Sequence, residues 1–112
     1  MGISTHILDT TAGCPAAEVP VTLARMADGV WSLINDAITD EDGRCKHLLP
    51  ADQALQVGMY RIRFETETYF RRNHFEGLYP YVEIVFKVSS AERHYHIPLL
   101  LTPNGYTTYR GS

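Results

Sequence analysis

The sequence predicts an all-β fold, an eight-stranded, two-sheet antiparallel β-sandwich with one short helix. Several segments of the chain alternate apolar and polar residues, which is the side-chain period of a half-buried strand. Asp-Gly and Asn-Gly pairs separate such segments, as tight turns between strands do. Only one segment has helical features, so two sheets must cover each other's apolar faces.

The first hairpin is predicted at Asp28-Gly29, between the apolar segments 19–27 and 30–35. Asp-Gly between apolar segments indicates a hairpin because Gly accepts a positive φ. Two further pairs predict turns before short strands: Asp42-Gly43 before 44–49, and Asn104-Gly105 before 106–109.

The clearest alternation lies in the second half of the chain. In segments 59–64 and 81–88, one face of each strand is apolar and the other mostly polar; the apolar faces are Tyr60, Ile62 and Phe64, and Val82, Ile84, Phe86 and Val88. Between these strands, Thr66 can cap a short, peripheral helix, Glu67 and Arg71 stand four residues apart, and Asn73 or Gly77 can end it.

Segment 94–101 combines an apolar face with titratable residues on the opposite face. Alternation places Tyr95, Ile97, Leu99 and Leu101 on one side and His94, His96, Pro98 and Leu100 on the other. Pro98 cannot donate a ladder hydrogen bond, which favours an edge or a bulge. The second face is typical of an oligomer interface that encloses a site, although two surface histidines without a function would have the same spacing.

Length and charge limit the class of protein. The chain has 112 residues, and we expect a single domain over 1–112. Its net charge is -3 and it lacks a basic run, which argues against nucleic acid as a partner. It has no apolar stretch of about 20 residues and no signal peptide, so we expect no membrane contact and a cytoplasmic location. Cys14 and Cys45 are expected to be free thiols.

A His-x-His pair such as His94 and His96 can bind zinc, with a further ligand from His6, His47 or His74. No second pair has a ligand-like spacing, so we predict no metal. The sequence also lacks a Gly-x-Ser-x-Gly elbow and a phosphate loop, which argues against serine-elbow hydrolases and nucleotide enzymes.

Arg44 follows the predicted Asp42-Gly43 turn, where a guanidinium can hold an anionic or imide-like substrate with two hydrogen bonds. A solvated arginine at a strand end is the simpler alternative. Segment 109–112 carries bulky and polar residues to its end, although such a terminus usually frays.

Several segments together resemble the transthyretin-like family, in particular its branch of 5-hydroxyisourate hydrolases. The resemblance spans nearly the whole chain, through His6-Ile7-Leu8-Asp9, Gly13-Cys14-Pro15-Ala16, Val19-Pro20-Val21, Gly58-Met59-Tyr60, segment 75–86 with Tyr79-Pro80-Tyr81-Val82-Glu83, segment 95–103, and segment 105–112. The ending Tyr109-Arg110-Gly111-Ser112 is similar to that of the enzymes. Asn104 departs from the family pattern, which usually has an aromatic residue at this position. This difference affects the local turn and the rim of the pocket.

The resemblance implies a homotetramer of eight-stranded sandwiches, in which two dimers meet across a channel that holds the active sites. It implies His6, Arg44 and His96 as catalytic residues and His6, Arg44, Tyr109 and Ser112 as substrate-binding residues. The implied reaction is hydrolysis of 5-hydroxyisourate to 2-oxo-4-hydroxy-4-carboxy-5-ureidoimidazoline in urate catabolism, with no metal or organic cofactor.

These residue types suit that chemistry. Opening a cyclic acyl-nitrogen bond needs an activated water, stabilisation of an oxyanion and a proton for the leaving nitrogen. A histidine can be the base at neutral pH, and Arg44 can hold the imide oxygens. The sequence does not decide between His6 and His96 as the base; we expect His6 to contact the water and His96 to orient it or relay its proton. Tyr109 and Ser112 are expected to position substrate, because no feature activates Ser112 as a nucleophile.

Two alternatives belong to other classes. A transthyretin-type carrier would bind a small aromatic ligand in the same channel without chemistry, but its channel would be more apolar. A β-sandwich interaction module would make the grouping of His6, Arg44 and His96 a coincidence.

Overall fold

The computed structural model describes all residues, 1–112, and contains nine strands and one helix. In chain order they are β1 (Ile3–Asp9), β2 (Cys14–Pro15), β3 (Pro20–Ala27), β4 (Val30–Ile38), β5 (Arg44–Cys45), β6 (Gly58–Phe64), α1 (Thr66–Arg72), β7 (Val82–Val88), β8 (Tyr95–Thr102) and β9 (Gly105–Thr108). The prediction of eight strands was therefore one too few. No predicted segment corresponded to β1 or to the two-residue β2, which pair with each other.

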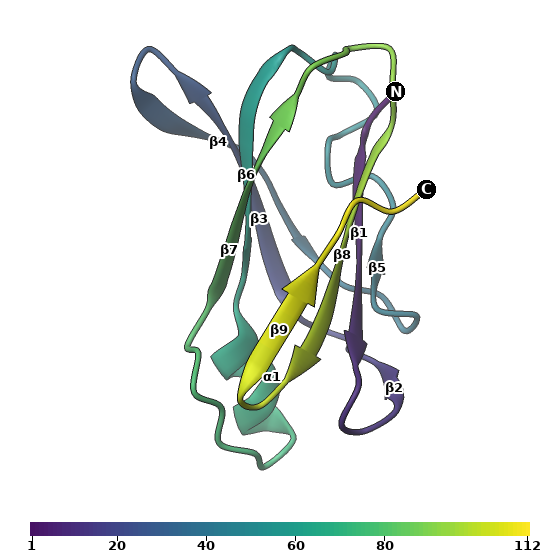
Figure 1. Cartoon of the computed structure of the whole chain (residues 1–112), viewed down its shortest axis with the longest axis vertical. Helices are drawn as coiled ribbons and strands as arrows, with labels where there is room; N and C mark the ends of the chain where they lie inside the picture. Colours follow the sequence, from purple (N-terminus) through teal and green to yellow (C-terminus); the bar gives the residue numbers. More distant parts are fainter.

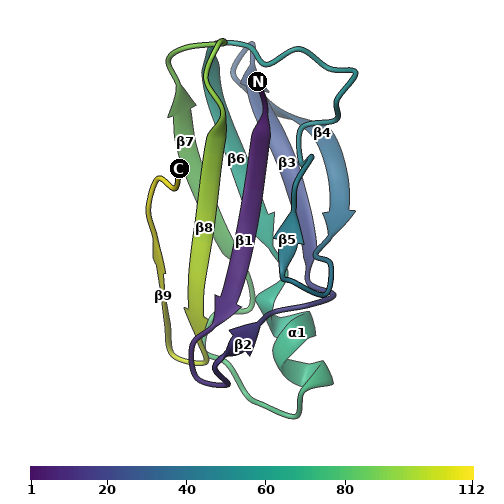
Figure 2. The same cartoon turned by 90° about the vertical axis from the view of Figure 1, so that its right-hand side faces the viewer.

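Two sheets face each other, as Figures 1 and 2 show. One has the order β2-β1-β8-β9, with β5 also paired to β1, and the other has the order β4-β3-β6-β7. The β-sandwich with one short helix is thus confirmed. The predicted strand 44–49 is wrong beyond Cys45, because the chain turns there so that the amides of Leu48 and Leu49 donate to the Ile3 carbonyl.

The sandwich is not wholly antiparallel. Strands β1 and β8 lie side by side and parallel, with Ser4 opposite His96 and His6 opposite Pro98. All other strand pairs are antiparallel. Parallel neighbours need a long connection, and here that connection includes the whole second sheet. Turn signals alone could not have revealed this pair.

The core lies between the two sheets and follows the predicted alternation. The predicted inward residues of β6 and β8 are all at most 5% exposed: Tyr60, Ile62 and Phe64, and Tyr95, Ile97, Leu99 and Leu101. In β7, Val82 and Val88 are buried and Ile84 and Phe86 are half-buried. The hairpin at Asp28-Gly29 is confirmed, since both residues have a positive φ and Ala27 pairs with Val30.

The helix α1 begins at Thr66, but Thr66 is not its cap. Its hydroxyl instead donates to the Tyr79 carbonyl at 2.8 Å, because Thr66 is fully buried beneath the following loop. The expectation of a peripheral helix was also wrong for one side of α1, where Tyr69 and Phe70 are buried in the core. No helix of this chain has both the length and the apolar character that a membrane span requires.

Pro98 does not lie on an edge strand, because β8 has neighbours on both sides. The ladder between β8 and β9 nevertheless stops beside it. Leu99 pairs with Thr108, and the next backbone pairing of the two segments is the bridge between His96 and Gly111. Without an N–H, Pro98 cannot bond the residue opposite. Tyr109 and Arg110 therefore leave the sheet before the tail returns to it at Gly111.

A buried hydrogen bond ties the end of β1 to the helix. The Tyr69 hydroxyl donates to an Asp9 carboxylate oxygen at 2.7 Å, and both side chains are at most 6% exposed. Burial raises the pKa of Tyr69, and the bond to Asp9 raises it further, so the phenol keeps its proton. The backbone amides of Thr11 and Ala12 donate to the other carboxylate oxygen.

We expect Tyr69→Phe to lower the free energy of unfolding by about 1.5–3 kcal/mol, because it leaves a buried carboxylate oxygen without its donor. Urea unfolding at fixed protein concentration measures this loss. Tyr81→Phe is the matched control, since the Tyr81 ring is 42% exposed. A change below about 0.5 kcal/mol in Tyr69→Phe would contradict the expected contribution.

Candidate active site

The candidate site lies on the outer face of the sheet that contains β1, β5 and β8. Alternate residues of β1 and β8 point into the core, so Ser4, His6 and His96 point outward. In the register, Ser4 lies opposite His96, and His6 lies opposite Arg44 of β5. Three strands from distant parts of the sequence thus place imidazole, hydroxyl and guanidinium groups on one surface.

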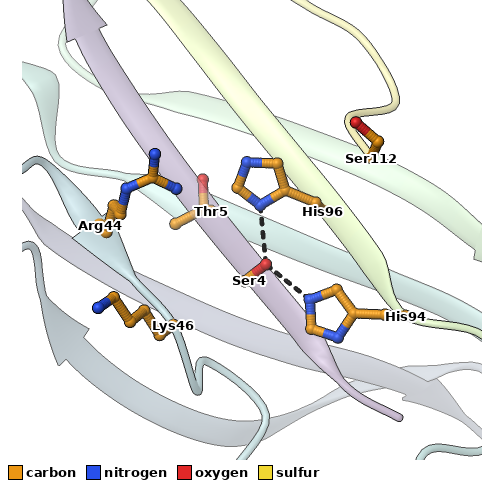
Figure 3. Close-up of a pocket in the computed structure, with 7 residues that line it drawn as sticks. All are labelled: Ser4, Thr5, Arg44, Lys46, His94, His96 and Ser112. Carbon is orange, nitrogen blue, oxygen red and sulfur yellow. Dashed lines mark hydrogen bonds between the residues drawn. The ribbon is translucent and has the colours of Figure 1, made fainter.

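A cavity of about 310 Å³ opens on this face (Figure 3). None of its seven lining residues is hydrophobic: Ser4, Thr5, Arg44, Lys46, His94, His96 and Ser112. It combines basic side chains, imidazoles and hydroxyl groups. This composition suits a polar or anionic ligand that offers several hydrogen-bond acceptors.

Ser4 lies within hydrogen-bond distance of both histidines of the cavity. Its Oγ lies 2.7 Å from His96 Nδ1 and 2.8 Å from His94 Nε2. Ser4 itself is only 8% exposed, and the register that sets it opposite His96 also fixes this contact. In Figure 3 the other ring nitrogen of His96 lies on the side of the ring toward Arg44.

A tight turn positions Arg44. The backbone amides of Arg44 and Asp42 donate to the Asp40 carboxylate at 3.0 and 2.9 Å, which lowers the pKa of Asp40 below its ordinary value. Gly43 has φ +74°, and a Cβ there would lie 2.4 Å from the Ile7 carbonyl oxygen. Only glycine therefore fits where this turn crosses β1, and the next residue, Arg44, begins β5.

The surroundings of His96 favour its neutral form. Its partial burial lowers the pKa of the imidazole below the ordinary 6.5, and electrostatic repulsion from the neighbouring Arg44, His6 and His94 lowers it further. A neutral imidazole has one ring nitrogen with a free lone pair, so His96 can accept a proton at neutral pH.

The carboxyl-terminal tail closes the cavity on the side of His96. The Gly111 amide donates to the His96 carbonyl at 2.8 Å, and the Arg110 guanidinium lies 4.4 Å from the centre of the Tyr95 ring. A Cβ on Gly111 would lie 2.5 Å from His96 Cδ2. The tail is thus held against β8 rather than frayed, and Ser112 reaches the cavity.

The structure brings together three of the five residues predicted for the site. Arg44, His96 and Ser112 line the cavity. His6 lies beside it, directly opposite Arg44 in the register, but is outside the lining. Tyr109 is 54% exposed and also outside the lining, because it leaves the sheet next to Pro98.

Four lining residues were not among the predicted site residues: Ser4, Thr5, Lys46 and His94. His94 was placed on the face of His96, but no partner was assigned to it. Alternation could have found two others, since Ser4 stands two residues before His6 and Lys46 two after Arg44. Their meeting depends on the pairing of β1 with β5 and β8, which alternation does not reveal.

The cysteines and Asn104 lie outside the lining of the cavity. Both cysteines are free thiols, as predicted, and burial raises the pKa of Cys45 to about 11. No three His, Cys, Asp or Glu side chains are grouped as metal ligands. Asn104 is exposed in the turn between β8 and β9 and does not line the cavity.

Comparison with known proteins gives consistent matches over the whole chain. A family model described as HIUase/Transthyretin family matches residues 3–111. A 5-hydroxyisourate hydrolase of Salmonella dublin is 43% identical over 110 residues, which cover 98% of this chain and 80% of that protein.

Two solved structures are similar along their full length. The 5-hydroxyisourate hydrolase of Klebsiella pneumoniae has a TM-score of 0.86 and 34% identity, with 100% of both chains covered. Sea bream transthyretin, solved in complex with thyroxine, has a TM-score of 0.90 and 33% identity, with 99% of this chain and 95% of that chain covered.

Proposed function

This chain belongs to the HIUase/transthyretin family, and from that membership together with its polar cavity we propose that it hydrolyses 5-hydroxyisourate. The observation that carries the proposal is the lining of the cavity, which contains Arg44 and two histidines and no hydrophobic residue. Such a site can hold a small heterocycle rich in carbonyl groups and move protons at it.

The same lining argues against the alternative function, that of a transthyretin-type carrier. An aromatic ligand held without chemistry gains most of its binding free energy from apolar contacts. The cavity offers none of these, although sea bream transthyretin, with its thyroxine, shares the fold. Tighter binding of thyroid hormone than of any purine-derived ring would favour the carrier.

In the proposed mechanism, His96 accepts a proton from water at its free ring nitrogen. The resulting hydroxide attacks the carbonyl carbon of the cyclic acyl-nitrogen bond, and the Arg44 guanidinium donates hydrogen bonds to the oxygen as it becomes negative. The bond between carbon and nitrogen then breaks, and the leaving nitrogen takes the proton from His96. The acyl group becomes a carboxylic acid, which loses its proton to solvent to give the carboxylate.

His6, Tyr109 and Ser112 are assigned supporting roles. His6 lies opposite Arg44 on the same face, where it can contact the attacking water. Ser112 lines the cavity and can donate to the substrate. Tyr109 is exposed, so a role in substrate binding needs another subunit to complete the site around it.

We further propose a homotetramer, with no metal or organic cofactor. The end strands β7 and β9 each have one unpaired edge, and a second copy can extend both sheets there. The cavity would then face a second dimer across a channel. A mass in solution of four times the 12.7 kDa chain tests this assembly. The cytoplasmic location also remains a prediction, which cell fractionation would test.

The function is tested with fresh 5-hydroxyisourate generated by urate oxidase. We expect the protein to accelerate the loss of 5-hydroxyisourate absorbance and to yield the ring-opened ureidoimidazoline carboxylate, identified by NMR. The same assay with heat-denatured protein is the control. Decay no faster than the spontaneous rate would contradict the proposed function.

The pKa of His96 makes a separate prediction. We expect kcat/KM to fall as the pH drops, with a midpoint below 6.5, because the protonated imidazole cannot accept a proton. In an NMR titration, Arg44→Gln should raise the pKa of His96, since it removes a positive charge that opposes protonation. Arg71→Gln on the exposed side of α1 is the control; an unchanged pKa of His96 in Arg44→Gln would contradict this account.

A further inference from the structure

We propose that Ser4 and His94 form a proton relay that holds His96 in one tautomer and moves its positive charge to the protein surface. The proposal rests on the hydrolase function inferred above and assigns Ser4 and His94 as positioning residues, because they act through His96. Its basis is the pair of short contacts from Ser4 Oγ, 2.7 Å to His96 Nδ1 and 2.8 Å to His94 Nε2 (Figure 3).

The single proton of the Ser4 hydroxyl links the two imidazoles. If the hydroxyl donates to His94 Nε2, its oxygen accepts from His96 Nδ1–H, and the free lone pair of His96 lies at Nε2. Nε2 is the ring nitrogen on the side of Arg44. Ser4 is only 8% exposed, so water competes weakly for this hydroxyl. The relay therefore presents the basic nitrogen of His96 to the substrate.

The surroundings of the two histidines give the relay a direction. His96 is half-buried and shares the cavity with Arg44 and Lys46 of β5, while His6 of β1 lies nearby and Ser112 lies on the tail side. Most of these groups are basic, and a positive charge on His96 is therefore unfavourable. His94 lies in the connection before β8 and is exposed, so water can solvate its charge.

The proton steps balance. When His96 Nε2 takes a proton from the attacking water, the Nδ1 proton passes to Ser4 Oγ and the Ser4 hydroxyl proton passes to His94 Nε2. His96 is then neutral with its proton at Nε2, and His94 carries the positive charge. As His96 Nε2–H protonates the leaving nitrogen, the reverse transfers return a proton to Nδ1, and no external reactant is needed.

Kinetics with three variants tests the relay. We expect Ser4→Ala to lower kcat by about tenfold or more with KM changed less than about twofold, because the substrate contacts remain. Ser4→Thr keeps a hydroxyl and should recover most of kcat. His94→Gln keeps a hydrogen-bonding group near Ser4 but cannot take the proton, so it should lose kcat as Ser4→Ala does. Ser32→Ala, at an exposed serine of β4, is the matched control.

A second measurement needs no substrate. Nitrogen NMR of the wild-type protein should show His96 with its proton at Nδ1, and Ser4→Ala should convert it to a mixture of tautomers. An unchanged tautomer in Ser4→Ala, or kcat within about twofold of wild type in either Ser4→Ala or His94→Gln, overturns the relay. A wild-type protein without activity on 5-hydroxyisourate would instead count against the proposed function, and the NMR result would still decide the hydrogen-bond pattern.

Discussion

Replacing His96 by Ala is expected to lower kcat/KM for 5-hydroxyisourate by about a hundredfold or more, because it removes the proposed base from the cavity. Arg44→Ala should have an effect of similar size, since it removes the cation that stabilises the oxyanion. Both side chains lie on the outer face of the sheet rather than in the core. We therefore expect the assembly and Tm to change little.

The decay of freshly generated 5-hydroxyisourate measures this loss. His74→Asn is the control, because His74 is exposed, lies outside the cavity and has a positive φ that Asn tolerates. If both His96→Ala and Arg44→Ala keep wild-type kcat/KM, the reaction does not take place in this cavity.

Gly111→Ala is expected to lower kcat by about tenfold or more, although it adds a single methyl group on the tail. The added Cβ would lie 2.5 Å from His96 Cδ2 and 3.2 Å from Pro98 Cγ. The His96 ring cannot turn away without breaking its 2.7 Å contact with Ser4, so either the tail or the ring must move. Either movement misplaces a group of the site.

Gly105→Ala separates this steric effect from a general effect of losing a glycine. A Cβ at Gly105 would have only an ordinary contact, at 3.8 Å from Thr102, and should leave kcat unchanged. Unfolding should be little affected in both variants, because Gly111 forms only an isolated bridge and a Cβ at Gly105 meets no close contact. Equal kcat for Gly111→Ala and wild type would show that the position of the tail against His96 does not matter for the reaction.

The parts of the fold that alternation describes were predictable. The core faces of β6, β7 and β8 and the hairpin at Asp28-Gly29 follow from local patterns, because burial on one side of a sheet imposes a period of two. The two-residue strands β2 and β5 are too short to show that period. The parallel pairing of β1 with β8 is set by packing of the whole chain, which no local pattern records.

The candidate site also combines residues that local patterns predict with residues that they do not. Arg44 and His96 could be proposed from a turn and a strand face, and a family resemblance joined them to His6 and the tail. The role of Ser4 could not be proposed, because it follows from the register that sets Ser4 opposite His96. The reason for glycine at position 111 also needed coordinates, since it is a contact with the imidazole of His96 on the neighbouring strand β8.

The pairing of β1 with β8 also determines when this protein can become active during its synthesis. Ser4 and His96 are separated by 92 positions, so β1 can pair with β8 only after the ribosome has made the long segment between them. Contacts between such distant residues slow folding and leave an open strand edge on the nascent chain. Activity therefore requires that β8 has been made, and chains that stop before β8 should be more prone to aggregation.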